Sequence, residues 1–187
     1  MNARVTRDEG FTLIEVLIAL SLTSLVILVI GGLFVSVTKT QQTVDAVTSS
    51  TTSGQQAATT ITDRVRNGSG FLLTDSGADQ LVVARSAGAG SALTWTCYGW
   101  YYSASGKSIR MATTAPGTKI TVPSAAQLAG WTLLVSGVSP RSGSQVFTSS
   151  GTQLSLAFNA QSGGHPPVAI QTSASPLTGT TEDHSCF

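Results

Sequence analysis

The chain has 187 residues, of which 10% are charged, and its formal net charge at pH 7 is +1. The charged fraction is less than half of the roughly 25% that is usual in a soluble globular domain, and the near-neutral balance offers no basic surface for nucleic acid. Composition therefore argues against a nucleic-acid-binding protein. The length predicts one folded domain that can bury a core without a metal or several disulfides.

The hydrophobic residues are concentrated near the N-terminus. Residues 16–37 contain no charged side chain, and the apolar run reaches back to Phe11 with Glu15 as its one charged residue. A helix rises about 1.5 Å per residue, so a helix of this length would span a bilayer. Arg4 and Arg7 precede the run, and the positive-inside rule therefore predicts that the leader faces the cytoplasm.

Two ordinary interpretations of this run fit less well. A cleavable secretory signal has an apolar region of about 7 to 15 residues that ends at a site with small residues, whereas this run is longer and continues to Lys39. A plain single-pass anchor has no use for Glu15, because a carboxylate costs about 2.5 to 3.5 kcal/mol at the centre of a bilayer. An acid in such a run indicates a functional partner for it.

The residues around Glu15 are more specific. The segment GFTLIEVLIAL at residues 10–20, behind a polar leader, resembles the class III signal of type IV prepilins and type II secretion pseudopilins. The resemblance covers the leader and the first half of the apolar helix. It implies that a prepilin peptidase cleaves after Gly10, that the new N-terminal residue Phe11 is methylated, and that Glu15 pairs with the free amine of a neighbouring subunit.

Elementary electrostatics agrees with the pairing that the resemblance implies. A buried carboxylate and a buried ammonium are each costly alone and tolerable together. A misplaced subunit would leave both charges unpaired, so the pair can select the correct stagger between subunits.

Many major pilins carry a helix-breaking proline where this sequence has Gly31-Gly32. Two glycines cost about 2 kcal/mol relative to alanine in a helix, which could supply the same local melting, and small residues could equally form a close-packing surface.

A second helical pattern follows the apolar run. Small or apolar residues recur at steps of three and four: Val44, Val47, Thr51, Gly54, Ala58, Ile61 and Val65. The pattern predicts a helix with one face packed on a sheet, and Asn67-Gly68 predicts its end. The resemblance implies that this helix continues from the apolar run as one long helix.

The remainder of the chain is typical of β-structure, because short segments alternate with Gly, Ser and Pro clusters. We expect strands at residues 81–85, 93–102, 108–112, 119–122, 131–138, 153–159 and 168–172. Residues 103–106 predict a hairpin loop. The expected fold class is α+β and pilin-like, with a long N-terminal helix packed on an antiparallel β-sheet. Its expected divisions are a leader (1–10), a transmembrane or filament-core helix (11–38), the head half of the helix (39–67) and a β-rich head (68–187).

Cys97 and Cys186 are the two cysteines of the chain. Both follow the apolar run, and an exported head lies in an oxidising compartment where disulfides persist. Pairing would close a long loop and stabilise the head by about 4 to 5 kcal/mol in the chain-entropy model, and two free thiols are the alternative. A disulfide pins the C-terminal loop in many pilins, so the resemblance favours the pair.

Aromatic residues are clustered in the expected strand at 93–102: Trp95, Tyr98, Trp100, Tyr101 and Tyr102. Alternation along a strand places Trp95 and Tyr101 on the face of Cys97, and Tyr98 with Trp100 on the other. One face is expected to be core. The other face is either further core or subunit packing, or an exposed patch that binds a sugar, a surface or a neighbouring subunit.

Signatures of catalysis and metal binding are missing from the sequence. His165 and His184 are its two histidines, and no H-E-x-x-H or C-x-x-C spacing accompanies them. Nucleophile-elbow, phosphate-loop and dinucleotide-binding motifs are also missing. We therefore expect no enzymatic activity, no cofactor and no metal site.

The resemblance implies a structural subunit, and we favour a minor pilin or pseudopilin. Its expected partners are prepilin peptidase, other pilin subunits in a helical filament and the inner-membrane assembly platform. The precursor would cross the inner membrane once, with its leader in the cytoplasm and its head exported, before assembly into an extracellular pilus or a periplasmic pseudopilus. The competing hypothesis is a membrane-anchored binding or adhesin ectodomain that keeps its leader and does not polymerise.

Overall fold

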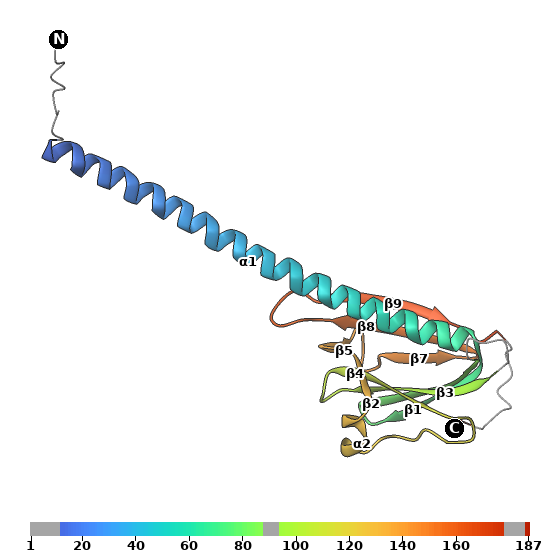
Figure 1. Cartoon of the computed structure of the whole chain (residues 1–187). Coiled ribbons are helices and arrows are strands. Elements are labelled where there is room, and N and C mark those ends of the chain that lie inside the picture. Colours follow the sequence, from blue (N-terminus) through green and yellow to red (C-terminus); the bar gives the residue numbers. More distant parts are fainter. Residues whose placement is uncertain (1–11, 88–93, 178–185) are drawn as a thin grey trace, which may run out of the picture. The chain divides into compact units, whose positions relative to one another are not determined.

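The computed structural model describes residues 12–87, 94–177 and 186–187 (Figure 1). Helix α1 (Leu13–Arg66) is followed by strands β1 to β9, with a short helix α2 (Ala125–Ala129) between β4 and β5. A long N-terminal helix packed on antiparallel β-structure confirms the expected α+β class. The chain divides into two compact units, Met1–Thr43 and Val44–Phe187. The four functional divisions expected from the sequence stay a prediction.

The first unit contains the N-terminal part of α1. This helix includes an 18-residue window with a mean hydropathy of 2.7, long and apolar enough to cross a membrane. Its apolar side chains are exposed in the isolated chain, as for Leu28 and Phe34 (76% and 73%). The hydroxyls of Ser21, Thr23 and Ser24 donate to helix carbonyl oxygens three or four residues earlier, at 2.7–2.9 Å. The segment can therefore enter an apolar environment with these hydroxyls satisfied.

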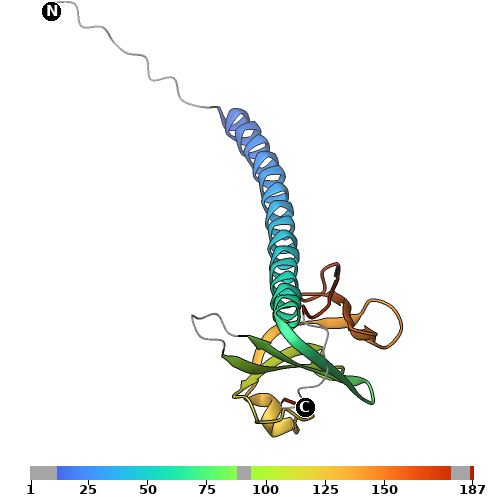
Figure 2. The ribbon, with the colours of Figure 1, turned by 90° about the vertical axis from the view of Figure 1, so that its right-hand side faces the viewer.

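Two antiparallel sheets form the body of the second unit, the head. The strands of the five-stranded sheet follow in chain order: β1 (Gly68–Ser76), β2 (Asp79–Ala87), β3 (Trp95–Ser103), β4 (Ser108–Thr114) and β5 (Thr132–Ser136). In the second sheet, β8 (Gln153–Ala160) pairs with β9 (Val168–Ala174) and, at its other edge, with β6 (Val138–Pro140) and β7 (Phe147–Ser150). Figure 2 shows α2 on the side of the five-stranded sheet that faces away from α1.

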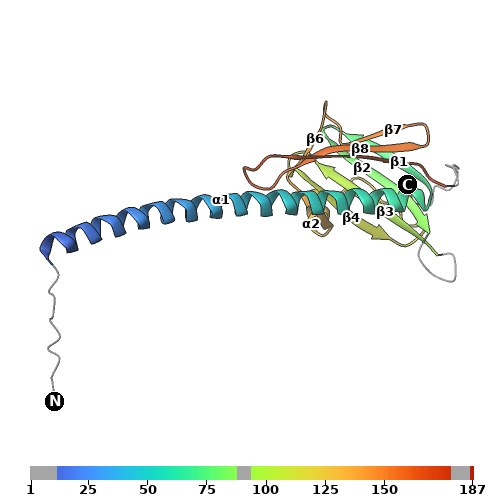
Figure 3. The ribbon, with the colours of Figure 1, turned by 90° about the horizontal axis from the view of Figure 1, so that it is seen from above.

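The later part of α1 packs one face against both sheets. Its buried residues are Ser50, Gly54, Ala57, Ala58, Ile61, Thr62 and Val65. Gly54, Ala58, Ile61 and Val65 belong to the predicted stripe, whereas Val44 is 57% exposed. Small residues allow a close approach, because a Cβ at Gly54 would overlap Cδ1 of Ile170 in β9. Figure 3 shows this part of α1 alongside β8 and β9.

Most of the strands expected from the sequence are confirmed. The segments at 81–85, 108–112, 153–159 and 168–172 lie within β2, β4, β8 and β9, and the expected strand at 93–102 agrees with β3 from Trp95 onward. The expected hairpin loop joins β3 to β4. The burial of β8 alternates residue by residue, as expected for a strand with one face in the core, whereas β2 and β3 are buried on both faces.

Two of the expected strands are wrong. The segment 119–122 has no strand pairing within the described residues. Ile120 instead packs on Gly99 of β3, where a Cβ would lie 2.8 Å from Ile120 Cγ2. The segment 131–138 is two strands in different sheets, because the chain leaves β5 at Gly137 and enters β6. Strands β1 and β7 and helix α2 lie outside the expected elements.

Gly137 is the point at which the chain crosses between the sheets. Its φ is +68°, a region that L side chains rarely adopt. Its carbonyl oxygen accepts a hydrogen bond from the Gln161 backbone N–H at 3.0 Å, and a Cβ at this position would overlap the Gln161 carbonyl oxygen. The crossing therefore requires glycine.

We expect Gly137→Ala to lower the free energy of unfolding of the head by about 2 to 4 kcal/mol, from the left-handed backbone and the overlap together. Gly143→Ala is the matched control, because Gly143 has a φ of +66° and a Cβ there would meet nothing within 4 Å. The control should cost about 1 kcal/mol. Urea unfolding measures both values, and equal losses would show that the overlap contributes nothing.

Candidate functional site

Glu15 lies in the first turn of α1, where its side chain is exposed. Thr12 precedes the helix, and the Glu15 backbone N–H donates to the Thr12 carbonyl oxygen at 3.0 Å and to its Oγ1 at 3.4 Å. A Thr followed three residues later by Glu has the spacing of a capping box. The Glu15 carboxylate itself accepts no hydrogen bond and forms no ion pair among the described residues. The start of the apolar helix therefore presents an unengaged carboxylate.

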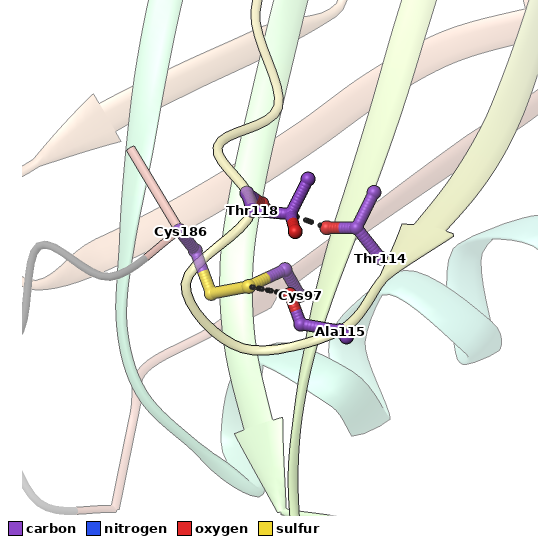
Figure 4. The surroundings of a disulfide bond; sticks show 5 residues. All are labelled: Cys97, Thr114, Ala115, Thr118 and Cys186. Atoms are coloured by element: carbon purple, nitrogen blue, oxygen red, sulfur yellow. Dashed lines mark hydrogen bonds between the residues drawn. A yellow bond between two sulfur atoms is a disulfide. The ribbon is translucent and has the colours of Figure 1, made fainter.

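The C-terminus is fixed to the five-stranded sheet by a disulfide (Figure 4). Cys97 of β3 is bonded to Cys186, and their Cα atoms are 5.5 Å apart. The Cys186 carbonyl oxygen also accepts a hydrogen bond from the Ile120 backbone N–H at 3.1 Å. Cys97 Sγ lies 3.8 Å from the Ala115 carbonyl oxygen, a contact without a hydrogen bond because a disulfide sulfur carries no proton. The last residues are thus tied to β3 and to the segment around Ile120.

Both faces of the aromatic segment in β3 are packed. Trp100 and Tyr102 are buried in the main core with α1, and Tyr98 stacks on Trp100 with ring centroids 6.0 Å apart. On the opposite face, Cys97 and Tyr101 belong to a second buried cluster with Leu81, Val83, Ile120 and Cys186. The alternation predicted from the sequence is confirmed. Packing, and not an open binding patch, accounts for Trp100, Tyr101 and Tyr102, whereas Trp95 is half-buried with the Arg85 guanidinium 4.2 Å from its ring centroid.

Asp79 at the start of β2 ties down the far end of β3. Its Oδ2 accepts a hydrogen bond from the Tyr101 hydroxyl at 2.7 Å, and its Oδ1 accepts one from the Ala104 backbone N–H at 2.8 Å. Burial, and then the hydrogen bond and charge of Asp79, raise the pKa of Tyr101 from 10.0 to about 12. Burial first, and then the charge of Asp79, also raises the pKa of Tyr102.

The head is expected to lose stability in alkaline solution as Tyr101 ionises. Because its pKa in the folded state lies above that of the unfolded chain, its contribution is complete below about pH 10 and is lost as the pH rises through about 12. The loss amounts to about 2 to 3 kcal/mol. Urea midpoints at about pH 9 and about pH 11.5 measure it. In the Tyr101→Phe variant, the free energy of unfolding should depend less on pH, and the remaining dependence should come from Tyr102. If the pH dependence of this variant is the same as that of the wild type, ionisation of Tyr101 is not its cause.

Gln80 connects the two sheets through a buried amide. Its Oε1 accepts hydrogen bonds from the backbone N–H groups of Val146 and Phe147 at 2.7 and 2.9 Å. Its Nε2 donates to the Phe147 carbonyl oxygen at 2.9 Å and to Asp75 Oδ1 at 2.8 Å. A buried amide with all of these bonds satisfied fixes one position of β7 against β2.

Comparison with known families gives one match at the N-terminus. Residues 6–35 match the family model described as the prokaryotic N-terminal methylation motif. The chain carries this methylation motif. The motif is the class III signal peptide of type IV pilins, so it supports a pilin-like or pseudopilin-like subunit that prepilin peptidase processes, and it suggests a structural protein. No curated protein and no solved structure matches the chain.

The predicted site residues fall into two groups. Gly10 and Phe11 lie within the matched motif but outside the described residues, whereas Glu15 lies in the motif and in the first turn of α1. The structure brings Cys97 and Cys186 together. Sequence reasoning missed Gln80, whose one signal is a polar residue at the start of the apolar run LVVA in β2.

Proposed function

We propose that this chain is a minor pilin or pseudopilin. It is made as a precursor that crosses the inner membrane once, is cleaved after Gly10 by prepilin peptidase and methylated at Phe11. It is then assembled through its N-terminal helix into a type IV pilus or a related pseudopilus. The observation that carries the proposal is the methylation motif at residues 6–35, which joins a polar leader to the apolar start of α1.

The exposed apolar surface of α1 supports this role. Large hydrophobic side chains between Leu13 and Val37 are exposed in the isolated chain, and a large exposed apolar surface marks contact with a membrane or another protein. The bilayer covers this surface in the precursor, and helices of neighbouring subunits cover it in a filament. One segment thus serves first as an anchor and then as filament core.

The free carboxylate of Glu15 supports a defined stagger between subunits. It accepts no hydrogen bond from the described residues of its own chain, although it lies at the start of an apolar segment. Cleavage after Gly10 creates a free ammonium at Phe11, and the ammonium of a neighbouring subunit can pair with Glu15. Because both charges are costly to bury alone, the pair favours one axial offset.

The head favours a minor over a major subunit. It contains two sheets with a chain crossing at Gly137, and the later part of α1 is rich in Ser and Thr, which have low helix propensity. The partners are prepilin peptidase, other pilin subunits and the inner-membrane assembly platform. The leader faces the cytoplasm and the head is exported.

N-terminal sequencing and intact mass of the protein from sheared filaments, compared with the membrane fraction, test the proposal. We expect a chain in the filaments that begins at methylated Phe11, at an abundance well below that of the main subunit. An abundance equal to the main subunit would make the protein a major pilin. A chain that begins at Met1 and is found only in membranes would overturn assembly and leave an anchored binding ectodomain.

A further inference from the structure

A row of three serine side chains crosses the five-stranded sheet on the face where α2 lies. Ser103, Ser108 and Ser136 are paired neighbours on β3, β4 and β5. Arg110 follows Ser108 by two residues, so it shares that face of β4. The three serines and Arg110 line one pocket of about 360 Å³, a volume within the range of ligand-binding pockets.

The Ser108 hydroxyl is nearly enclosed and has no partner within the described chain. Ser108 is 6% exposed. A Cβ at Gly106 would stand 3.2 Å from Ser103 Oγ and 3.4 Å from Ser108 Oγ, so both hydroxyls border the space beside Gly106. Gly106 also lines the pocket. Ser103 Oγ accepts a hydrogen bond from the Gly106 backbone N–H at 3.2 Å and lies 3.3 Å from Ser105 Oγ, so the missing side chain of Gly106 leaves the Ser108 hydroxyl as the one without a partner in the described chain that a ligand can reach.

Arg110 supplies a positive charge with several unused donors. Its guanidinium carries five N–H donors, and one of them, on Nη1, bonds to the Trp131 carbonyl oxygen at 3.0 Å. No carboxylate among the described residues pairs with it. The pocket is also lined by the apolar side chains of Leu128 in α2 and Leu133 in β5. A cation and hydroxyls beside an apolar wall are complementary to a carboxylate on a partly apolar chain.

We propose that this pocket binds the carboxylate of an acidic side chain from a partner polypeptide. The Arg110 guanidinium would hold the two carboxylate oxygens through parallel N–H···O bonds, and the Ser108 hydroxyl would donate a third bond. The site lies in the head and does not use the apolar part of α1. Its test is therefore independent of filament assembly.

The position of the pocket favours a polypeptide over an acidic sugar. Strand β5 is the edge of the described five-stranded sheet, and Leu133 on it is 48% exposed. An extended peptide can add to a sheet edge through main-chain hydrogen bonds and direct alternate side chains into a neighbouring pocket. Among the described residues, those that line the pocket include no aromatic side chain on which a sugar ring could stack.

The test is an NMR titration of the isotope-labelled full chain in detergent micelles, following the Arg110 Nε–Hε signal. The probes are two acetylated and amidated pentapeptides that contain leucine and threonine around a central glutamate or a central glutamine. We expect a saturable shift of the Arg110 signal and about tenfold tighter binding of the glutamate peptide, as charge-assisted hydrogen bonds would give.

Four variants locate the effect. Arg110→Gln should abolish the preference for glutamate, whereas Lys107→Gln should retain it, because Lys107 is an exposed cation beside the pocket and not part of its lining. Ser108→Ala should weaken binding of the glutamate peptide a few-fold, and Gly106→Ala should weaken both peptides by filling the space beside the hydroxyls. The last two variants keep Arg110, so they decide the matter if Arg110→Gln does not fold.

Three results would overturn the proposal. The first is equal affinity for the two peptides, or no saturable shift with either. The second is that Lys107→Gln loses as much of the preference for the glutamate peptide as Arg110→Gln does. The acid would then be attracted by the positive charge of the surrounding surface and not by Arg110 in the pocket. The third is tighter binding of glucuronate than of the glutamate peptide, which would assign the pocket to an acidic sugar.

Discussion

Replacing Glu15 by glutamine is expected to lower the incorporation of this protein into filaments by about a hundredfold or more. In the proposed assembly, the Phe11 ammonium of one subunit pairs with Glu15 of another in an apolar environment. Removing one partner of a buried ion pair costs about 3 to 5 kcal/mol, because the other charge stays buried without compensation. A cost of that size shifts an equilibrium by about two to four orders of magnitude.

Replacement by glutamine tests the charge of the Glu15 side chain separately from the role of this position in the first turn of the helix. The bonds between Thr12 and Glu15 use the Glu15 backbone N–H and not its side chain, so glutamine at this position keeps them. The variant therefore keeps the first turn and loses the charge. Asp45→Asn is the matched control, because Asp45 is an exposed acid on the same helix that follows the apolar run, and we expect it to assemble normally.

Quantitative mass spectrometry of sheared filaments and membranes measures the ratio of assembled to unassembled protein for each variant. N-terminal sequencing checks that cleavage after Gly10 still occurs, so that a processing defect is not mistaken for an assembly defect. If the Glu15→Gln and Asp45→Asn variants enter filaments equally well, the ion pair has no part in assembly.

Elements with a strong local pattern could be predicted from the sequence. Strand β8 alternates Leu154, Leu156 and Phe158, all fully buried, with more exposed residues. The four buried members of the helical stripe predict the packed face of α1 for the same reason, since a repeating pattern records which side meets the core. The motif around Glu15 could be predicted because it is defined by a specific order of residues, which can be read directly from the sequence.

Features that depend on distant contacts could not be predicted. Gly137 lies within an apolar segment that has the pattern of one strand, and its change of sheet depends on a positive φ and on the Gln161 carbonyl oxygen. Segment 119–122 alternates like a strand, yet Ile120 packs on Gly99 without pairing. Gln80 bonds to groups 66 and 67 residues away, and a local pattern cannot report such partners.

The double variant Cys97→Ala, Cys186→Ala is expected to lower the free energy of unfolding of the head by about 4 to 5 kcal/mol. The disulfide joins residues 89 positions apart, and a cross-link that closes so long a loop removes much of the conformational entropy of the unfolded chain. Both cysteines are fully buried in the cluster that includes Tyr101 and Ile120. Truncation to alanine therefore also removes packing contacts, in addition to the cross-link.

Urea unfolding followed by tryptophan fluorescence measures this loss, and the wild-type chain reduced with dithiothreitol is the control that keeps both sulfur atoms. If the cross-link provides most of the stability, the reduced chain and the double variant should unfold at similar urea concentrations, well below the oxidised chain. A reduced chain as stable as the oxidised one would contradict the entropic origin. Any loss in the double variant alone would then measure the packing of the two buried side chains against β3 and the segment around Ile120.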